Sequence, residues 1–516
     1  MIAVLALLAA LDPAALARLV RGDPPERLQA VSSLVAAGPE ATPVLRALLE
    51  GNLQLTPGGA ALIDEGGSLR FALSGAPSDA PRDELEKVAI DNRLRRALER
   101  AVRELGLSSS AAADRLAAAR ALLDTGEAEV LPAVEAALAR ETDPQVRDAL
   151  QTTRAMLALA SPDREQRLAA IEQLQRAPGA HSKRQLLLRL PAEQDPAVLQ
   201  ALRRALASIE TSLRRAELVG LAFSGLSLAS ILLLAALGLA ITFGLMGVIN
   251  MAHGELLMIG AYATWGVQSV FRSQAPSALG WYLAFALPAS FAAAALAGVL
   301  LELLVVRKLY GRPLETLLAT WGASLLLMQG VRSAFGAQNV EVANPAWMSG
   351  GVTVLPGLVL PWNRIAILLF AAAVLLVVWL LLTRTRLGLL VRAVTQNRQR
   401  AAGLGVATPR VDLLAFALGA GIAGLGGCAL SQVGNVGPEL GQGFIVDSFM
   451  VVVLGGVGQL AGTVIAAVGL GLANKLLEPS AGAVLAKIAV LVFVILFIQR
   501  RPQGFFAPPG RAVDEG

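Results

Sequence analysis

The scarcity of charge in the second part of the chain constrains its fold more than any other feature. From Leu218 to the last residue, 299 positions carry 10 acidic and 17 basic side chains, whereas residues 1–217 hold 29 of the 39 carboxylates. Apolar segments of spanning or near-spanning length recur there at about 219–247, 252–270, 281–306, 314–335, 363–383, 411–431, 445–457, 460–477 and 483–499. Each helix that crosses a bilayer needs about 20 consecutive, mostly apolar residues. We therefore predict an all-α chain whose residues 218–516 form a polytopic bundle of eight to ten transmembrane helices.

The basic residues of this region predict its orientation. Twelve of the seventeen fall in three groups, which are Arg307, Lys308 and Arg312, then Arg384, Arg386, Arg392, Arg398, Arg400 and Arg410, and finally Arg500, Arg501 and Arg511. Lys and Arg collect in the cytoplasmic loops of membrane proteins, and counting crossings back from these groups leaves residues 1–217 outside the cytoplasm. The net positive charge therefore follows from membrane topology and does not indicate a nucleic-acid partner.

The first residues predict either a targeting segment or an ordinary helix. Residues 1–11 are apolar but too few to span a bilayer, and Ala15-Leu16-Ala17 has the small-x-small form of a signal-peptidase site. No Lys or Arg precedes the apolar run. We favour a signal peptide over residues 1–17, which agrees with the predicted orientation. The alternative is the first helix of the soluble domain.

Residues 18–217 predict a soluble domain of paired amphipathic helices. Apolar residues recur at helical spacing after Arg27, Arg115 and Arg167, and the Asp-Pro pairs at 143 and 195 are typical of second helices in HEAT-type repeats. Such pairs stack into an α-solenoid. Short apolar runs punctuated by glycine predict a β-hairpin insertion near 52–81. The sequence of this domain holds no recognisable catalytic constellation, so we expect it to make contacts rather than to catalyse a reaction.

A cluster of polar residues interrupts the apolar sequence at the end of the first predicted span. Asn250, His253 and Glu255 fall within six residues, where each uncompensated polar group costs several kcal/mol. These groups should therefore face protein or water. They could contact a solute directly, or they could brace and gate a broken helix around Gly254. A position near the cytoplasmic end of the span favours the second role.

The sequence also limits the source of energy and the cofactors. None of the five Lys residues is followed by Ser or Thr, so the chain contains no phosphate-binding loop of the Walker type. A pump would need a separate ATPase. The lone Cys428 excludes a disulfide framework or a zinc site, and we predict no cofactor and no metal. The segment from Arg392 to Gly405 predicts one short amphipathic helix closed by glycine, which is either a docking element or a positive-inside anchor.

Four sequence blocks carry a family resemblance. The blocks are Ala236-Leu-Gly-Leu-Ala-Ile-Thr-Phe-Gly244-Leu-Met-Gly247-Val-Ile-Asn250-Met-Ala-His253-Gly254-Glu255, Arg312-Pro-Leu-Glu315-Thr-Leu-Leu-Ala-Thr-Trp321-Gly322, Asn339-Val-Glu341-Val-Ala-Asn344-Pro-Ala-Trp347-Met-Ser-Gly350, and Asp447-Ser-Phe-Met-Val-Val-Val-Leu-Gly455-Gly456-Val-Gly458. Over about residues 218–510 the chain resembles permeases of the branched-chain amino acid type of ABC transporter. The third block and the ending Ile498-Gln-Arg-Arg-Pro502-Gln-Gly504-Phe-Phe resemble the urea-transport branch, some of whose members carry an extracytoplasmic N-terminal extension.

This resemblance implies an assembly in the bacterial inner membrane. Two permeases pair, two ATPase subunits hydrolyse ATP, and a periplasmic binding protein delivers the solute, so the chain itself is not expected to be an enzyme. The resemblance also makes the segment from Arg392 to Gly405 the coupling helix on which an ATPase docks. Its residues would be Arg392, Asn397, Ala401, Ala402 and Gly403, although Arg392 stands where other ABC importers carry Glu.

Urea is small, neutral and planar, so its conduit needs hydrogen-bond donors and acceptors without net charge. We assign Asn250, His253 and Glu255 to the solute path or its gate. Glu315 and Thr320 are further candidates, with a helix cap at an interface as the alternative role. Gly455, Gly456 and Gly458 would allow close helix crossing. The open alternatives are a permease for branched-chain amino acids or short amides, and a membrane-anchored scaffold whose solenoid binds partners.

Overall fold

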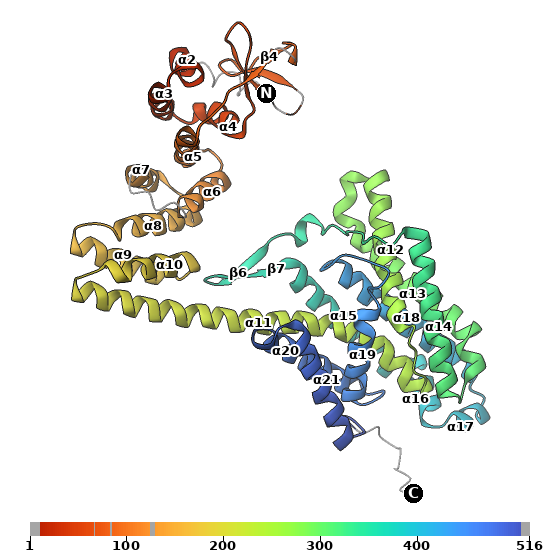
Figure 1. Ribbon diagram of the computed structural model, residues 1–516. Coiled ribbons are helices and arrows are strands. Elements are labelled where there is room, and N and C mark those ends of the chain that lie inside the picture. Colours follow the sequence, from red (N-terminus) through yellow and green to blue (C-terminus); the bar gives the residue numbers. More distant parts are fainter. Residues whose placement is uncertain (1–10, 65, 67, 83–84, 124–129, 507–516) are drawn as a thin grey trace. The chain divides into compact units, whose positions relative to one another are not determined.

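A computed structural model describes residues 11–506, apart from residues 65, 67, 83, 84 and 124–129. The chain divides into two compact units, residues 1–214 and 215–516. Both units are mostly helical, and Figure 1 shows their elements coloured along the sequence. Residues 1–10 of the predicted signal peptide and residues 507–516 of the basic tail lie outside the described residues.

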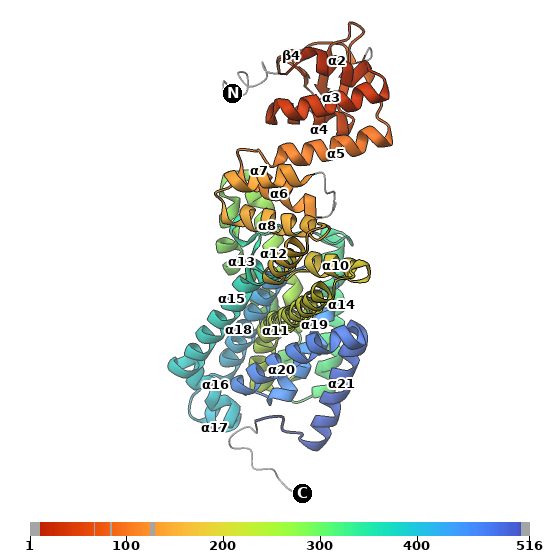
Figure 2. The ribbon, with the colours of Figure 1, turned by 90° about the vertical axis from the view of Figure 1, so that its left-hand side faces the viewer.

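The first unit combines short helices with a small antiparallel sheet. Its helices are α2 (Pro13–Arg21), α3 (Pro24–Ala37), α4 (Thr42–Glu50), α5 (Asn92–Gly106), α6 (Ala112–Leu123), α7 (Leu131–Arg140), α8 (Pro144–Ala158), α9 (Arg164–Arg176), α10 (Ala180–Arg189) and the beginning of α11 (Pro196–Met246). Its strands are β1 (Leu53–Leu55), β2 (Ala61–Asp64), β3 (Leu69–Phe71), β4 (Pro77–Ser78) and β5 (Glu86–Lys87). Figure 2 shows this unit from a second side.

The inserted sheet is larger than predicted. Instead of a hairpin near 52–81, five strands pair in the order β4-β3-β2-β1-β5 and continue to Lys87. The last strand has only two residues, both exposed, so the sequence contains no alternation of apolar and polar residues that could have predicted it. Leu53 and its cross-strand partner Ile63 lie on one face of the sheet, where Leu53 shares a core with α2 to α5. Leu62 pairs with Gln54 and is buried on the other face.

Helix α2 includes part of the segment predicted as a signal peptide. Asp12 caps it by accepting a hydrogen bond from the Ala14 amide at 2.9 Å, and Leu16 and Leu19 are buried in the core of the first unit. The predicted cleavage site after Ala17 would lie within this helix. For residues 13–17 the packing therefore favours the alternative of an ordinary first helix, and cleavage stays a prediction.

The helical pairs of the first unit share a repeated polar motif. Arg115 on α6 makes a bidentate ion pair with Glu141 after α7, with N–O distances of 2.8 and 2.9 Å. Glu141 also accepts hydrogen bonds from the amides of Thr142 and Asp143. The bond from Arg115 is the main cause that lowers the pKa of Glu141 to about 2, although its burial acts in the opposite direction.

The same motif recurs 52 residues further along the chain. There Arg167 on α9 pairs with Glu193 at 3.1 Å, and Glu193 accepts from the amides of Gln194 and Asp195. In both copies the following Asp caps the next helix, since Asp195 accepts from Ala197 and Asp143 from Gln145. The first unit thus contains two copies of one helix-pair motif. Its membership of the HEAT class stays a prediction.

The second unit is a helical bundle with one β-hairpin. It contains the rest of α11, α12 (His253–Gln274), α13 (Tyr282–Leu304), α14 (Pro313–Phe335), α15 (Trp362–Arg384), α16 (Arg386–Gln396), α17 (Arg398–Gly403), α18 (Thr408–Ser431), α19 (Gln442–Gly455), α20 (Leu460–Ala481) and α21 (Ala483–Arg500). The hairpin consists of β6 (Gly351–Leu355) and β7 (Leu358–Pro361). The chain is mostly helical, as predicted, and the five-stranded sheet falls in the region of the predicted β insertion, but this second hairpin was not predicted.

The predicted polytopic region is confirmed in its main feature. Seven helices of the described residues are long and apolar enough to cross a membrane, fewer than the eight to ten predicted, and they are α11, α13, α14, α15, α18, α20 and α21. Helix α12 has 22 residues and the required length, but its polar residues make it less apolar. Helix α19 has 14 residues, or about 21 Å, which is too short to span a hydrocarbon core of about 30 Å.

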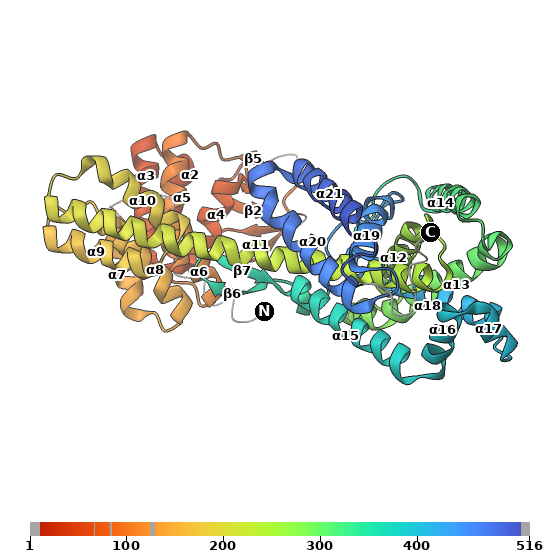
Figure 3. The ribbon, with the colours of Figure 1, turned by 90° about the horizontal axis from the view of Figure 1, so that it is seen from below.

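Helix α11 forms the centre of the bundle. It runs without interruption through its apolar part, as Figure 3 shows, and the hydrophobic residues from Ile231 to Leu237 are all buried. Helices α12, α13 and α18 pack closely against one another beside it. Where α12 meets α18, glycines face each other, so that a Cβ on Gly260 would collide with the backbone of Gly424. Small residues let membrane helices approach closely, and here the two backbones are in direct contact.

Candidate functional site

The break between α11 and α12 creates the candidate site. Helix α11 ends at Met246, and Gly247 turns the chain with a φ of 65°, a conformation that residues other than glycine rarely adopt. The segment up to Ala252 is not helical, and α12 begins at His253. Asn250 is 1% exposed and its Oδ1 accepts a hydrogen bond from the Ala252 amide at 3.0 Å. The asparagine side chain thus satisfies backbone that the break exposes.

His253 fastens α12 to the centre of the bundle. Its ring is fully buried, and Nε2 lies 2.9 Å from the carbonyl oxygen of Ala235 on α11. Because a carbonyl can only accept, Nε2 carries the proton and donates it. Nδ1 is then an acceptor, and it has no partner among the described residues. The imidazole therefore links the two sides of the helix break.

Glu255 lies two residues further along α12 and faces α14. The Ser324 hydroxyl donates to its Oε1 at 2.9 Å, while Oε2 is buried without a partner among the described residues. Thr320, one turn earlier on α14, accepts a hydrogen bond from the Met251 amide at 3.1 Å. The hydroxyl groups of Thr320 and Ser324 thus hydrogen-bond to the backbone of the helix break and to the Glu255 carboxyl group, respectively.

A seam of buried polar atoms follows the contact between α12 and α14. We define this α12–α14 seam by Asn250, Glu255 and Tyr262 on one side and Thr320 and Ser324 on the other. Glu255 and Tyr262 are seven residues apart, so they lie on the same helix face. Asn250 Nδ2 and the Tyr262 hydroxyl have no partner in the described part of the chain, as is also true of Glu255 Oε2. Buried polar groups are nearly always hydrogen-bonded, so these atoms are available to a polar solute or to water.

The structure separates the predicted site residues into two groups. Asn250, His253, Glu255 and Thr320 lie together at the helix break, whereas Glu315 is exposed in the first turn of α14. Sequence reasoning missed Ser324 as a partner of Glu255. Thr316, Thr320 and Ser324 recur every four residues and are all buried. This spacing of small hydroxyl residues was the signal that could have identified one face of α14.

The predicted coupling segment consists of two helices instead of one. Helix α16 ends at Gln396, and Asn397 caps α17 by accepting a hydrogen bond from the Arg400 amide at 2.9 Å. An Asn side chain that binds the following backbone competes with helix continuation, which explains the break. Ala401 is buried, whereas Arg392, Ala402 and Gly403 are exposed and Leu404 is 86% exposed. Both Figure 1 and Figure 2 show α16 and α17 at one end of the bundle.

Arg398 connects this segment to the end of α11. Its guanidinium forms a bidentate ion pair with the fully buried Asp412 of α18 and lies 4.6 Å from the ring centroid of Tyr310. The Tyr310 hydroxyl in turn donates to the sulfur of Met246 at 2.7 Å, and Met246 is the last residue of α11. Burial raises the pKa of Tyr310, and the negative charge of Asp412 raises it further, so the hydroxyl stays protonated.

The predicted packing glycines lie at another helix crossing. A Cβ on Gly455 would lie 2.5 Å from the carbonyl carbon of Gly462, at the contact between α19 and α20. Gly458 has a φ of 80° and approaches Gly244 of α11. Gly456 also has a positive φ, and its surroundings include the carbonyl oxygen of Gln503. These residues thus shape turns and close contacts and are not part of the α12–α14 seam.

The spanning helices, the broken helix and the buried polar seam together define a polytopic membrane transport protein. Residues 221–499 match the family described as "Branched-chain amino acid transport system / permease component", and because this match covers more than half of the chain, the chain belongs to that family. It is therefore a permease component rather than an enzyme.

Individual relatives agree with this family assignment. The chain is 27% identical over 292 residues to the high-affinity branched-chain amino acid transport system permease protein BraD of Pseudomonas aeruginosa, covering 55% of this chain and 94% of BraD. It is also 27% identical over 300 residues to the permease protein LivH of Escherichia coli K12, covering 56% of this chain and 94% of LivH. No solved structure matches the chain.

Proposed function

We propose that this permease imports a small neutral solute, urea, through a path that includes the α12–α14 seam. The observation that carries the proposal is the set of buried, unpartnered polar atoms beside a broken helix inside a transport bundle. Broken helices of this kind form solute sites in many transporters, because their free backbone groups can bind polar solutes. Asn250 Nδ2 can donate to a urea carbonyl, and Glu255 Oε2 can accept from a urea amino group.

The charges of the bundle support a neutral solute. Glu255, Glu302 and Asp412 are buried there, and the last two already pair with Arg307 and Arg398. No Lys or Arg is buried among the described residues of the second unit. The carboxylate of an amino acid would therefore find no buried basic side chain, whereas urea requires none. The resemblance of residues 339–350 to the urea branch supports the same solute.

A branched-chain amino acid is the second candidate solute. The printed names of BraD and LivH assign this substrate class to the relatives, and their similarity extends over nearly their whole length. In that case the solute ammonium would bind Glu255, and its carboxylate would need backbone amides at the start of α12. Short amides remain a third possibility within the same mechanism.

We further propose that α16 and α17 dock a separate ATPase subunit. The exposed Leu404 and Arg400 at this end of the bundle offer an apolar and a basic contact to a soluble partner. The chain of contacts from Arg398 through Tyr310 to Met246 would transmit movement of α17 to the helix break. A second permease subunit and a periplasmic solute-binding protein complete the proposed assembly, which lies in the bacterial inner membrane.

The proposed orientation puts the basic ends of the helices in the cytoplasm and the first unit outside. The two copies of the Arg–Glu motif in the first unit support its role as a repeat domain that binds a partner. Protease added to spheroplasts should cleave the first unit. Full protection of this unit when the protease has access to the periplasm would contradict the orientation and leave the solute proposal intact.

Solute uptake tests the proposed function directly. Cells that carry the complete transport system should accumulate labelled urea, and excess leucine should not compete. The variant Glu255→Gln should lower the uptake rate while the protein still inserts, with Glu315→Gln as a matched control because Glu315 is exposed. Uptake of labelled leucine that excess urea does not reduce would refute the urea proposal in favour of the second candidate.

A further inference from the structure

An apolar cavity of about 560 Å³ lies at one end of the membrane bundle. It is formed by the beginnings of α13 and α15, the end of α18 and the turn Ala346–Met348. The opposite ends of the same three helices carry Arg307, Arg384 and Arg410. The cavity and the predicted coupling segment are therefore at opposite ends of the membrane unit.

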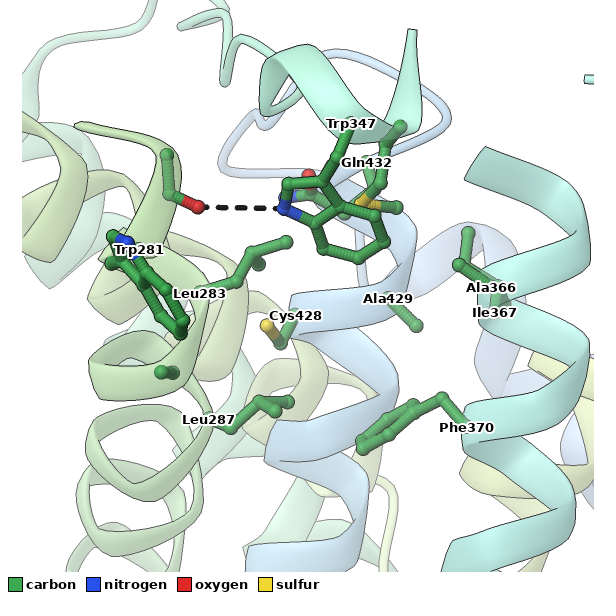
Figure 4. A pocket seen from close by; sticks show the side chains of 13 residues that line it. Trp281, Leu283, Leu287, Trp347, Ala366, Ile367, Phe370, Cys428, Ala429 and Gln432 are labelled. Atoms are coloured by element: carbon green, nitrogen blue, oxygen red, sulfur yellow. Dashed lines mark hydrogen bonds between the residues drawn. The ribbon is translucent and has the colours of Figure 1, made fainter. Parts of the chain in front are cut away.

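The lining of the cavity is apolar, and the polar side chains of Trp347 and Gln432 are already hydrogen-bonded to the protein. Figure 4 shows Trp347 over one end and Leu287 and Phe370 on either side of the other end. The Trp347 Nε1 donates to the carbonyl oxygen of Gly280 at 3.4 Å. Gln432, the most polar residue of the lining, accepts from the Tyr282 hydroxyl at 3.0 Å and donates to the Ser431 hydroxyl at 3.0 Å. A polar solute would lose its own hydrogen bonds with water on entry, so the cavity suits an apolar occupant.

We propose that this cavity binds a fatty-acyl chain of a membrane phospholipid. The medium around these three helices is the bilayer, so an acyl chain is the apolar group that surrounds the cavity in the greatest amount. Trp281 and Trp347 at its rim are 72% and 61% exposed, and tryptophan collects at the level of the lipid headgroups. The headgroup would lie at these tryptophans, and the chain would extend past Ala366 toward Phe370.

The fit between the acyl chain and the cavity determines whether the lipid binds. Lipid tails and the cavity lining are equally apolar, so transfer from the bilayer brings no hydrophobic gain, and the occupant is held by packing contacts alone. A side chain that fills the cavity should therefore displace the lipid. This prediction concerns the membrane unit only and does not depend on the identity of the transported solute.

Photo-crosslinking of the full-length protein tests the proposal. The probe is phosphatidylcholine with a diazirine near the end of one acyl chain, incorporated into nanodiscs that contain the protein. Mass spectrometry should find crosslinks at Leu287 and Phe370 that persist when unlabelled lipid is added shortly before illumination. Crosslinks at Leu326, which is 75% exposed on α14, should disappear because that lipid exchanges freely.

Two variants and the only cysteine of the chain make the test specific. Ala366→Phe, at a half-buried lining position, should reduce crosslinks at Phe370 several-fold and leave those at Leu326 unchanged. Ala429→Phe is the second filling variant if the first fails to insert. Cys428 lines the cavity, so a small apolar maleimide should label it more slowly in lipid than after delipidation. Unchanged crosslinking at Phe370 in both filling variants, or equal labelling rates, would overturn the proposal.

Discussion

The direct contact between the backbones of α12 and α18 makes a quantitative prediction about stability. In Gly260→Ala, the added Cβ would lie 2.6 Å from the carbonyl carbon of Gly424 and closer still to other backbone atoms of that residue. Ordinary van der Waals contact begins at 3.4 Å, so the two helices must move apart. Gly266 is the matched control, because it lies on the same helix and a Cβ there has nothing within 4 Å.

The magnitude follows from comparing the two variants. Both replace glycine by alanine within α12, so the gain in helix propensity, about 1 kcal/mol, is common to both and cancels. The difference between them is then the cost of overpacking, typically about 1–3 kcal/mol. Gly260→Ala should be the less stable variant by this amount, and it should also transport more slowly because α12 carries His253 and Glu255.

Heating in detergent provides the assay. Membrane proteins of this size unfold irreversibly, so the measured quantity is the fraction of protein that stays monodisperse after a fixed time at each temperature. The midpoint for Gly260→Ala should lie below that for Gly266→Ala, which should match or exceed the unsubstituted protein. Equal midpoints for the two variants would refute the close approach of α12 and α18 as described.

Three further substitutions test the polar contacts. Ser324→Ala removes the donor to Glu255 and should lower stability by about 1–3 kcal/mol and reduce solute uptake, measured by heating and by transport. Arg398→Lys loses the bidentate pair with Asp412 and should retain the ATPase during purification but weaken solute-stimulated ATP hydrolysis. In the first unit, the pKa of Glu141 is lowered in the folded state, so this carboxylate stabilises the fold fully above about pH 4.5 and loses its effect as the pH falls toward about 2. Hydrogen exchange at the Thr142 and Asp143 amides, which donate to Glu141, should show this loss of stability. The variant Glu141→Gln should remove the pH dependence.

Each of these predictions has a control at an exposed or separate position. Ser273→Ala should change neither stability nor uptake, since Ser273 is exposed at the end of α12. Arg384→Lys should leave solute-stimulated ATP hydrolysis intact, because Arg384 is exposed at the end of α15 and has no carboxylate partner among the described residues. If Arg398→Lys instead released the ATPase altogether, Arg398 would belong to the docking surface and not to the connection. Protection at Thr142 that stays constant between pH 5 and pH 3 would contradict the pKa argument.

The membrane bundle could be predicted because its signal is long and additive. Each span requires about 20 apolar residues, and the described helices α11 to α15 and α18 to α21 coincide with the nine predicted segments to within a few residues, apart from α11, which begins 23 residues earlier. The early start of α11 was missed because Pro196 to Glu217 is amphipathic and continues into the apolar part without a breaker. An apolar run in the sequence predicts the membrane-spanning part of a helix, but it does not predict where the helix itself begins.

Of the candidate site, the sequence predicted only the residues that are close together in the chain. Asn250, His253 and Glu255 are close in the chain, and their association needed no knowledge of the fold. The Glu255 contact with Ser324 joins residues 69 positions apart, and the Arg398 contact with Asp412 was not predicted either, because nothing in the sequence says which faces of two helices meet. For the small sheet, strands of two to four residues are below the length at which alternation is recognisable.

The glycine contacts between α12 and α18 also determine where this protein can move. Two helices whose backbones touch cannot slide or rotate without collision, so they must travel as one rigid block during a transport cycle. The α12–α14 seam is different, since it is bridged by hydroxyl groups that can exchange one hydrogen-bond partner for another. We therefore expect the opening and closing motion to divide the bundle between α12 and α14, with α18 carried along on the side of α12.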